Sequence, residues 1–314
     1  MKHALVVPVY RNEESVPQLF AAVSGIAAAT PGEFECVFVV DGSPDRSGER
    51  LGELLPGADF KSTLLLLSRN FGSFAAIRAG LKAVDADYYA MMAADLQEPP
   101  ELVLEFFRSL REEPVDVVIG VREARADPAA GKLAAKGFWA LYRRLVQPEM
   151  PAGGFDLFGC NREFRDHLLE LTEVRSALVG QVLWLGFRRK HVGYGRLARE
   201  HGDSAWTLGK KLNYLQDSIF AFTDLPIRVL LGTGLIGIVI SLLVGGAVLA
   251  GRLSGAIAVP GYAATILVVL FFAAINLFGL GIVGSYAWRA YENSKHRPES
   301  IVLSRSTFGG RAGA

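Results

Sequence analysis

A carboxylate and an amide stand two residues apart at the end of a short apolar run. Asp95 and Gln97 follow residues 88–92, and Pro99 and Pro100 come directly after them. Because proline supplies no backbone N–H, the run is expected to be a strand that ends here, with both polar side chains in the turn beyond it. The carboxyl edge of an open α/β sheet is where ligands bind. Asp95 is therefore a candidate ligand-binding residue, and capping of the helix that starts near Pro100 is the alternative.

Earlier apolar runs also end in polar segments. Asp41 precedes Gly42 and Ser43, and it can accept hydrogen bonds from a base or a ribose, while Gly42 lets the backbone turn tightly beside a ligand. An ordinary Asx turn that closes a strand is the alternative. A third segment, residues 68–73, precedes a helix whose first amides can face an anion, unless Ser73 simply caps that helix.

These segments need a scaffold that brings strand ends together. Short β-branched runs alternate with amphipathic stretches over residues 4–124, which is typical of an α/β fold with a mostly parallel sheet covered by helices. The predicted strands are residues 4–9, 35–40, 62–68, 88–92 and 115–120, and the predicted helices include residues 13–29 and 74–84. No GxGxxG segment follows the first strand and no GxxxxGKS/T segment is present, so the dinucleotide and P-loop classes lose their main support.

The composition suggests a soluble part joined to membrane segments. The 314 residues are 51% hydrophobic and 21% charged, with a mean hydropathy of +0.28. A net charge of +1 gives no global electrostatic reason to expect a nucleic acid as partner. Cys36 and Cys160 are too few for a disulfide framework and fit a reduced, cytoplasmic setting. The first residues contain no signal-peptide pattern.

Two uncharged stretches near the end of the chain are each long enough to cross a membrane. Residues 229–250 and 262–288 both exceed the roughly 20 residues that span about 30 Å of hydrocarbon, and burial of the pair in a protein core is the alternative. Arg252 lies in the short connection between them. The outer flanks are more basic, and this predicts that both ends of the pair are cytoplasmic. The basic residues of these flanks are Lys210, Lys211, Arg228, Arg289, Lys295 and Arg297.

Two further stretches have the pattern of amphipathic helices at a membrane surface. Residues 132–146 combine aromatic and basic side chains, and residues 210–222 begin with two lysines and continue with regularly spaced apolar residues. A packed surface helix with a solvated basic face is the alternative for the first stretch.

Four segments taken together resemble the inverting family 2 glycosyltransferases, which have a GT-A nucleotide-sugar fold. They are residues 8–13, 41–45, 68–72 and 94–100, and they read PVYRNE, DGSPD, SRNFG and ADLQEPP. The set is most similar to the polyprenyl-phosphate glycosyltransferases, and the resemblance covers nearly the whole chain.

This resemblance implies roles for particular residues. Asp95 and Gln97 would hold Mg²⁺ or Mn²⁺, although Ala93 stands where the family usually has another carboxylate. One protein carboxylate can suffice, because Mg²⁺ is commonly held by one or two carboxylates together with substrate phosphates. The catalytic candidates are Asp95, Asp156, Arg196 and Arg199. Asp156 is expected to do positioning or electrostatic work rather than act as a strong general base, because a phosphate monoester is already anionic at neutral pH. The nucleotide-binding candidates are Pro8, Tyr10, Asn12, Glu13, Asp41, Ser43, Arg69 and Ala94, and the candidates for the lipid phosphate or diphosphate are Arg122, Lys132 and Arg199.

The resemblance also implies an organisation and a set of partners. Residues 1–209 would form the cytoplasmic transferase domain, residues 210–227 a juxtamembrane helix, residues 228–289 the two spans and residues 290–314 a cytoplasmic tail. The partners would be a nucleotide sugar, with UDP favoured over GDP, a polyprenyl phosphate acceptor and the lipid bilayer of a bacterial inner membrane. Glycine-lined spans and the family suggest a homo-oligomer, for example a tetramer.

Two other functions compete with this interpretation. A processive polysaccharide synthase is disfavoured because its QxxRW segment is absent and two spans are few for a channel. A catalytically silent membrane scaffold or accessory subunit is favoured by Ala93.

Overall fold

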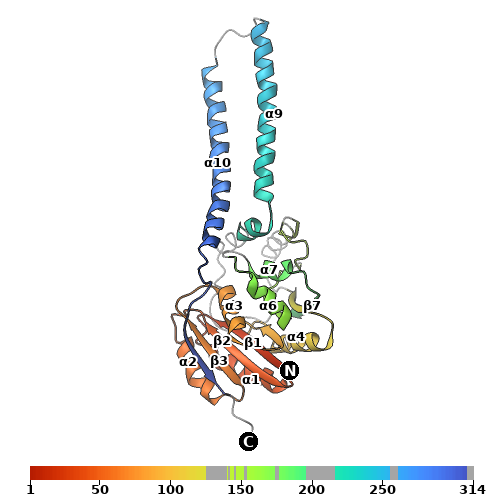
Figure 1. Ribbon diagram of the computed structural model, residues 1–314, viewed down its shortest axis with the longest axis vertical. Helices are drawn as coiled ribbons and strands as arrows, with labels where there is room; N and C mark the ends of the chain where they lie inside the picture. Colours follow the sequence, from red (N-terminus) through yellow and green to blue (C-terminus); the bar gives the residue numbers. More distant parts are fainter. Residues whose placement is uncertain are drawn as a thin grey trace.

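A mixed sheet of eight strands organises the part of the chain that carries the site. The computed structural model describes residues 1–124, 140, 142–144, 146–151, 154–173, 177–195, 216–254 and 261–309. Within these residues the strand order is β7-β5-β6-β4-β1-β2-β3-β8. Two long helices project from the sheet domain, and Figure 1 shows them side by side above it.

The first strands in the chain are parallel, as the sequence predicts. β1 lies between β2 and β4 and is parallel to both, and β2 is also parallel to β3. β6 is antiparallel to β4 and β5, β7 is parallel to β5, and β8 is antiparallel to β3. The strands are β1 (Lys2–Val9), β2 (Glu33–Val40), β3 (Lys61–Leu67), β4 (Tyr88–Met91), β5 (Val117–Ala124), β6 (Phe158–Asn161), β7 (Arg189–Gly195) and β8 (Val302–Phe308).

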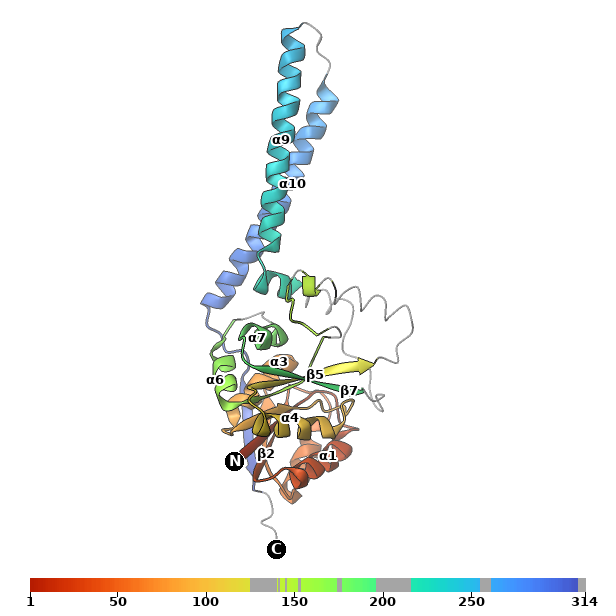
Figure 2. The same cartoon turned by 90° about the vertical axis from the view of Figure 1, so that its right-hand side faces the viewer.

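Helices cover both faces of this sheet. Gly80 packs on Val6 from one side, whereas Gly159 packs on Phe106 from the other. Figure 2 shows α1 and α4 on one face and α3, α6 and α7 on the other. The helices are α1 (Val16–Ala29), α2 (Ser47–Leu54), the short η1 (Leu55–Gly57), α3 (Ser73–Ala83), α4 (Pro100–Glu112), α6 (Arg162–Glu170), α7 (Leu178–Trp184), α9 (Leu225–Leu253) and α10 (Tyr262–Ser294). Because helices lie on both faces, the central strands are largely apolar, and residues 4–7 of β1 have no exposed surface.

The predicted α/β class and the mostly parallel order of the first strands are confirmed. The strand predicted at residues 115–120 is displaced: β5 continues to Ala124 because it pairs with β7 beyond Gly120. Strands β6, β7 and β8 were not predicted from the sequence. Most of the amphipathic helix predicted at residues 132–146 lies outside the described residues, and so does the first part of the one predicted at 210–222, whose residues 216–222 are helical.

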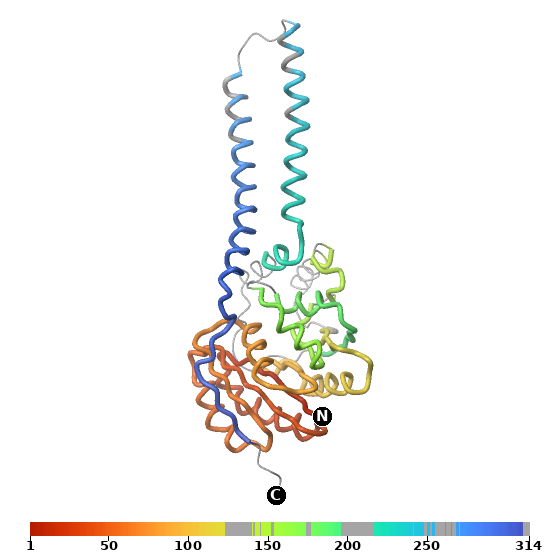
Figure 3. The backbone as a smooth tube through the Cα atoms, in the orientation of Figure 1, coloured from red at the N-terminus to blue at the C-terminus, as the bar shows by residue number. Residues whose placement is uncertain are grey.

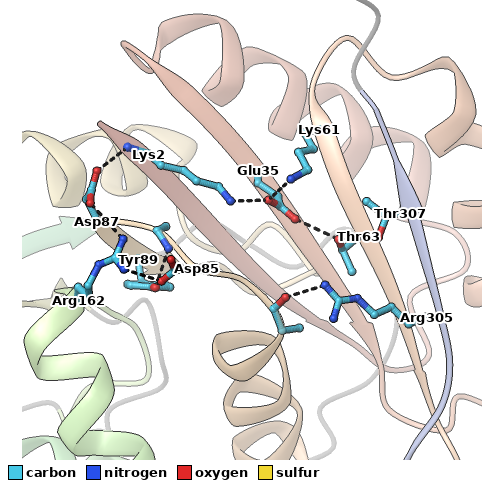
Figure 4. A network of polar contacts seen from close by, with 12 residues as sticks. Lys2, Glu35, Lys61, Thr63, Asp85, Asp87, Tyr89, Arg162, Arg305 and Thr307 are labelled. Atoms are coloured by element: carbon cyan, nitrogen blue, oxygen red, sulfur yellow. Dashed lines mark hydrogen bonds and ion pairs between the residues drawn. The ribbon is translucent and has the colours of Figure 1, made fainter.

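The chain returns to the sheet after the second long helix. Figure 3 traces the tube from the base of α10 to β8, which runs along the outer side of β3. Figure 4 shows how this edge is fastened: Arg305 donates to the carbonyl of Ala83 at the end of α3 over 2.9 Å, and the hydroxyls of Thr63 and Thr307 lie 3.5 Å apart. The tail is therefore a structural part of the sheet domain.

Candidate active site

Four loops meet at one edge of the sheet. Strands β1, β2, β3 and β4 are mutually parallel and end at Val9, Val40, Leu67 and Met91, so the loops that follow them emerge on the same side. This is the edge at which open α/β sheets bind ligands. The predicted convergence of the four polar segments is confirmed by this topology.

Asp45 joins the first of these loops to the second. Its carboxylate accepts hydrogen bonds from the Ser43 hydroxyl at 2.6 Å, the Ser47 hydroxyl at 2.7 Å and the backbone N–H of Glu13 at 3.1 Å. The Ser43 oxygen in turn accepts the N–H of Arg11 at 2.8 Å. Partial burial alone would raise the pKa of Asp45, but these hydrogen bonds outweigh it and hold the pKa below its usual range.

Sequence reasoning did not select Asp45 as a site residue. The sequence did contain a signal: Ser43 and Ser47 each stand two residues from Asp45. At this spacing both hydroxyls can donate to the one carboxylate, as they do in the structure. Glu13, which was selected, forms an ion pair with Arg50 at 3.1 Å and accepts the N–H of Arg46 at 3.2 Å. These contacts fix the backbone of the first loop against the start of α2.

Asp41 holds the third loop in place. Its two carboxylate oxygens accept the backbone N–H groups of Phe71 at 2.7 Å and Gly72 at 2.8 Å, and its side chain is buried. Gly72 is the N-cap of α3, so Asp41 also places a negative charge at the amino end of that helix. Ser73 is not the cap, because α3 begins at this residue. The contact of Asp41 with a nucleotide stays a prediction, and it would need the remaining lone pairs of these oxygens.

Gly42 makes this junction sterically tight. Its φ is +56°, and a Cβ added there would lie 2.2 Å from the carbonyl carbon of Arg69. Both the left-handed backbone and the close approach require glycine. The loops that follow β2 and β3 are therefore in direct backbone contact without a ligand.

The turn after β4 carries Asp95 and Gln97. Between them Leu96 has a φ of +52°, which is uncommon for a residue with a side chain and here turns the acid and the amide around one tight corner. The carbonyl of the neighbouring Ala94 accepts the Ser15 hydroxyl at 3.2 Å, so this turn is tied to the loop after β1. The capping alternative for Asp95 is wrong: the N-cap of α4 is Pro99, which has no side-chain cap.

Arg122 and Asp156 form an ion pair beside β5 and β7. Arg122 also donates to the Tyr194 hydroxyl at 3.2 Å, and its side chain is 10% exposed whereas that of Asp156 is 57% exposed. Burial lowers the pKa of Arg122, but the charge of Asp156 and the hydrogen bond to Tyr194 reverse this and hold its pKa above the ordinary value. Two residues predicted to act on the acceptor side are thus in direct contact.

The remaining predicted residues are placed as follows. Pro8 lies inside β1 opposite Val39, and Arg69 is exposed with its guanidinium 4.0 Å from the centre of the Phe71 ring. The backbone N–H of Tyr10 donates to the side chain of Asn12 at 3.1 Å. Arg196, Arg199 and Lys132 lie outside the described residues.

The donor set at the β4 turn consists of the Asp95 carboxylate and the Gln97 amide oxygen. Among the described residues no group of three or more His, Cys, Asp or Glu side chains is arranged to hold a metal. One carboxylate and one amide oxygen fit a hard cation that arrives with other oxygen ligands, such as those of a diphosphate. Within the described residues, Asp95 and Gln97 therefore fit a metal that a nucleotide helps to bind rather than a site closed by protein ligands.

Comparisons with known proteins identify the family to which the chain belongs. The chain is 31% identical to the bactoprenol glucosyl transferase of Shigella phage SfV, with 96% of this chain and 98% of that protein covered. It is 28% identical to the prophage bactoprenol glucosyl transferase homolog of Escherichia coli K12, over 96% and 98% of the two chains. An uncharacterized glycosyltransferase of Synechocystis is 29% identical, with 95% of this chain and 94% of that protein covered. The family description "Glycosyl transferase family 2" matches residues 4–171, which contain all four loops, and the chain belongs to this family.

Proposed function

We propose that this protein transfers a sugar from a nucleoside-diphosphate sugar to a polyprenyl phosphate at a membrane surface. The observation that carries the proposal is the convergence of the four polar loops at one sheet edge, in a chain of which 96% matches a bactoprenol glucosyl transferase. UDP is the favoured nucleotide and undecaprenyl phosphate the favoured acceptor.

The reaction is a single displacement with inversion. An oxygen of the lipid phosphate attacks the anomeric carbon, the new C–O bond forms, and the bond from that carbon to the nucleotide diphosphate breaks. The electron pair of the broken bond leaves with the diphosphate, and no covalent intermediate with the protein is needed. A divalent cation bound with the diphosphate would offset the negative charge of this leaving group.

The residues of this chain orient the two substrates. The loops that contain Tyr10, Asn12 and Ser43 would hold the nucleotide, and their stiffness follows from the hydrogen bonds around Asp45. Asp95 and Gln97 would hold the metal. The exposed carboxylate of Asp156, fixed by Arg122, would face the acceptor phosphate and position it without removing a proton.

The two long helices would anchor the enzyme in the bilayer as a hairpin. The apolar stretch Leu225–Ala247 has a mean hydropathy of 2.4 and Phe271–Ser294 one of 1.5, and these windows are 0% and 11% buried by the protein itself. Apolar helices this exposed need another apolar medium around them, and their lengths fit a lipid core of about 30 Å. Both helices join the sheet domain at the same end of the hairpin (Figure 1), so domain and tail would lie on one side of the membrane, the cytoplasmic one.

The test is transfer by the purified full-length protein. Labelled UDP- and GDP-sugars are incubated with undecaprenyl phosphate and Mg²⁺ or Mn²⁺, and lipid product is extracted. We expect labelled lipid with at least one donor, abolished by Asp95→Ala and unaffected by Glu101→Gln, which removes an exposed carboxylate nearby in the sequence. Absence of product with every donor, together with nucleotide binding that is unchanged when metal is removed, would favour the silent scaffold instead.

A further inference from the structure

A buried arginine on α3 is not used by the proposed reaction. Arg78 has a side chain only 5% exposed, and its guanidinium donates to three different segments. The acceptors are a Glu299 carboxylate oxygen at 2.6 Å, the Gln181 amide oxygen at 3.0 Å and the carbonyl of Leu171. A guanidinium removed from water needs such partners, because an unpaired buried charge is strongly unfavourable.

These partners join the tail to the transferase domain. Glu299 lies between the end of α10 at Ser294 and the start of β8 at Val302, so it belongs to the segment that leaves the apolar hairpin. Two residues further on, the carbonyl of Ile301 accepts the N–H of Ser68 at 2.9 Å, directly before the loop that carries Arg69. The exit of the hairpin is thus fastened to α3 and to the end of β3.

Gln181 extends the connection to α7. Its amide oxygen faces Arg78, and its amide nitrogen donates to Glu173 at 2.7 Å. The neighbouring Gly180 packs so tightly on the ring of Phe222 that an added Cβ would lie 2.3 Å from it. Phe222 is in the helical residues 216–222, which precede α9.

The same short helix is bound to the base of α10. Arg289 donates to Asp217 at 2.7 Å, and the Phe220 and Tyr286 rings are 5.1 Å apart. Both helices of the hairpin are therefore connected to α7, one through Phe222 and the other through Glu299 and Arg78. Figure 2 shows α7 between the sheet and the base of the hairpin.

We propose that Arg78 is a positioning residue that holds the transferase domain at a fixed height and orientation below the hairpin. This proposal rests on the proposed function, because it concerns how the donor site meets an acceptor whose phosphate stays at the membrane surface. A short acceptor that dissolves in water can reach the donor site whatever the orientation of the transferase domain relative to the hairpin. Dependence on Arg78 is consequently specific to an acceptor fixed in a bilayer.

The experiment compares two acceptors with the full-length protein in nanodiscs. The variants are Glu299→Gln, which removes the charged partner of Arg78, Arg78→Met, and Arg78→Lys, which keeps the charge. Lys82→Gln is the matched control, because Lys82 lies 4.0 Å from the same Glu299 carboxylate but is 52% exposed. Acceptors are undecaprenyl phosphate in the bilayer and a short, water-soluble prenyl phosphate, and UDP affinity is measured for each protein.

We expect Glu299→Gln and Arg78→Met to reduce transfer to the bilayer acceptor by about tenfold or more, since misplacement by about 1 Å can lower a rate about 100-fold. Transfer to the soluble acceptor and UDP affinity should stay within about threefold of wild type, and Arg78→Lys should recover part of the loss. Equal losses with both acceptors, weaker UDP binding, or no loss would each overturn the proposal.

A second measurement separates this proposal from the proposed function. Both native cysteines are buried, so spin labels can be directed to Glu53→Cys in α2 and Val229→Cys in α9, two exposed positions. We expect a narrow distance distribution that broadens in Glu299→Gln and not in Lys82→Gln. If wild-type protein transfers no sugar to either acceptor, the proposed function fails, and an unchanged distance distribution in Glu299→Gln would refute the positioning role independently.

Discussion

Gly42 lies against the backbone of Arg69 so closely that a Cβ would stand 2.2 Å from the Arg69 carbonyl carbon. This contact joins the loops after β2 and β3, which also share the Asp41 hydrogen bonds to Phe71 and Gly72. We expect Gly42→Ala to weaken UDP binding by more than tenfold, because backbone atoms cannot move aside as a side chain would and the φ of +56° is strained for alanine. Titration calorimetry with UDP measures this change.

Gly52→Ala provides the control for that substitution. Gly52 is inside α2, and an added Cβ would meet nothing within 4 Å. Alanine in a helix is favoured over glycine by about 0.5–1 kcal/mol, so this variant should unfold at the same or a slightly higher temperature and bind UDP normally. Equal UDP affinity in both variants would show that the Gly42 contact is irrelevant to the nucleotide site.

The hydrogen bonds of Asp45 should make stability dependent on pH in acid. The folded pKa of Asp45 lies below the value of about 3.9 for an unfolded chain, so the folded state binds its proton less readily. The resulting stability is fully present above about pH 4 and is lost as the pH falls through the folded pKa. Asp45→Asn should therefore be less stable than wild type at pH 7, and the difference should shrink below about pH 4. Urea unfolding at several pH values measures it; a difference that is constant with pH would show that the charge of Asp45 contributes nothing.

The parts of the fold that could be predicted are those that local sequence specifies. β1, β2 and β4 are buried on both faces, so each reads as a continuous apolar run bounded by turn residues. β8 has no such signature, because its residues are mostly exposed and its partner β3 lies about 240 positions earlier in the chain. Pairing at that separation is decided by tertiary packing and not by local pattern.

The site residues also divide into those that local sequence specifies and those that only tertiary packing brings together. Asp95 and Gln97 were found because they follow an apolar run and precede two prolines. The connection from Arg78 to Glu299 and Gln181 has no local pattern, because its three members come from parts of the chain more than 100 positions apart. Arg78 itself reads as an ordinary charged position on an amphipathic helix.

The metal and the nucleotide should bind together. Asp95 offers one carboxylate, Gln97 offers one amide oxygen and Ala93 supplies no ligand, so these predicted metal-binding positions alone offer too few oxygens to hold Mg²⁺ or Mn²⁺. We expect electron paramagnetic resonance to detect no Mn²⁺ binding without UDP at Mn²⁺ concentrations on the order of 0.1 mM, and to detect clear binding when UDP is present. Ala93→Asp should add a carboxylate and allow binding without UDP, while Asp95→Ala should prevent binding in both conditions. Tight Mn²⁺ binding by the wild type without UDP would refute this site.

Asp156 should affect turnover far more than stability. Its carboxylate is 57% exposed, and in Asp156→Asn the amide oxygen can still accept a hydrogen bond from the mostly buried Arg122, so this substitution should change the melting temperature little. Glu149→Gln is a matched control, because Glu149 is 62% exposed and pairs with the 18% exposed Arg189 at 2.7 Å in a similar arrangement. If Asp156 positions the acceptor phosphate, Asp156→Asn lowers the rate of transfer at least tenfold with UDP affinity unchanged, and Glu149→Gln leaves the rate unaltered. Similar rates in the two variants would mean that the pair of Asp156 with Arg122 is only a surface ion pair.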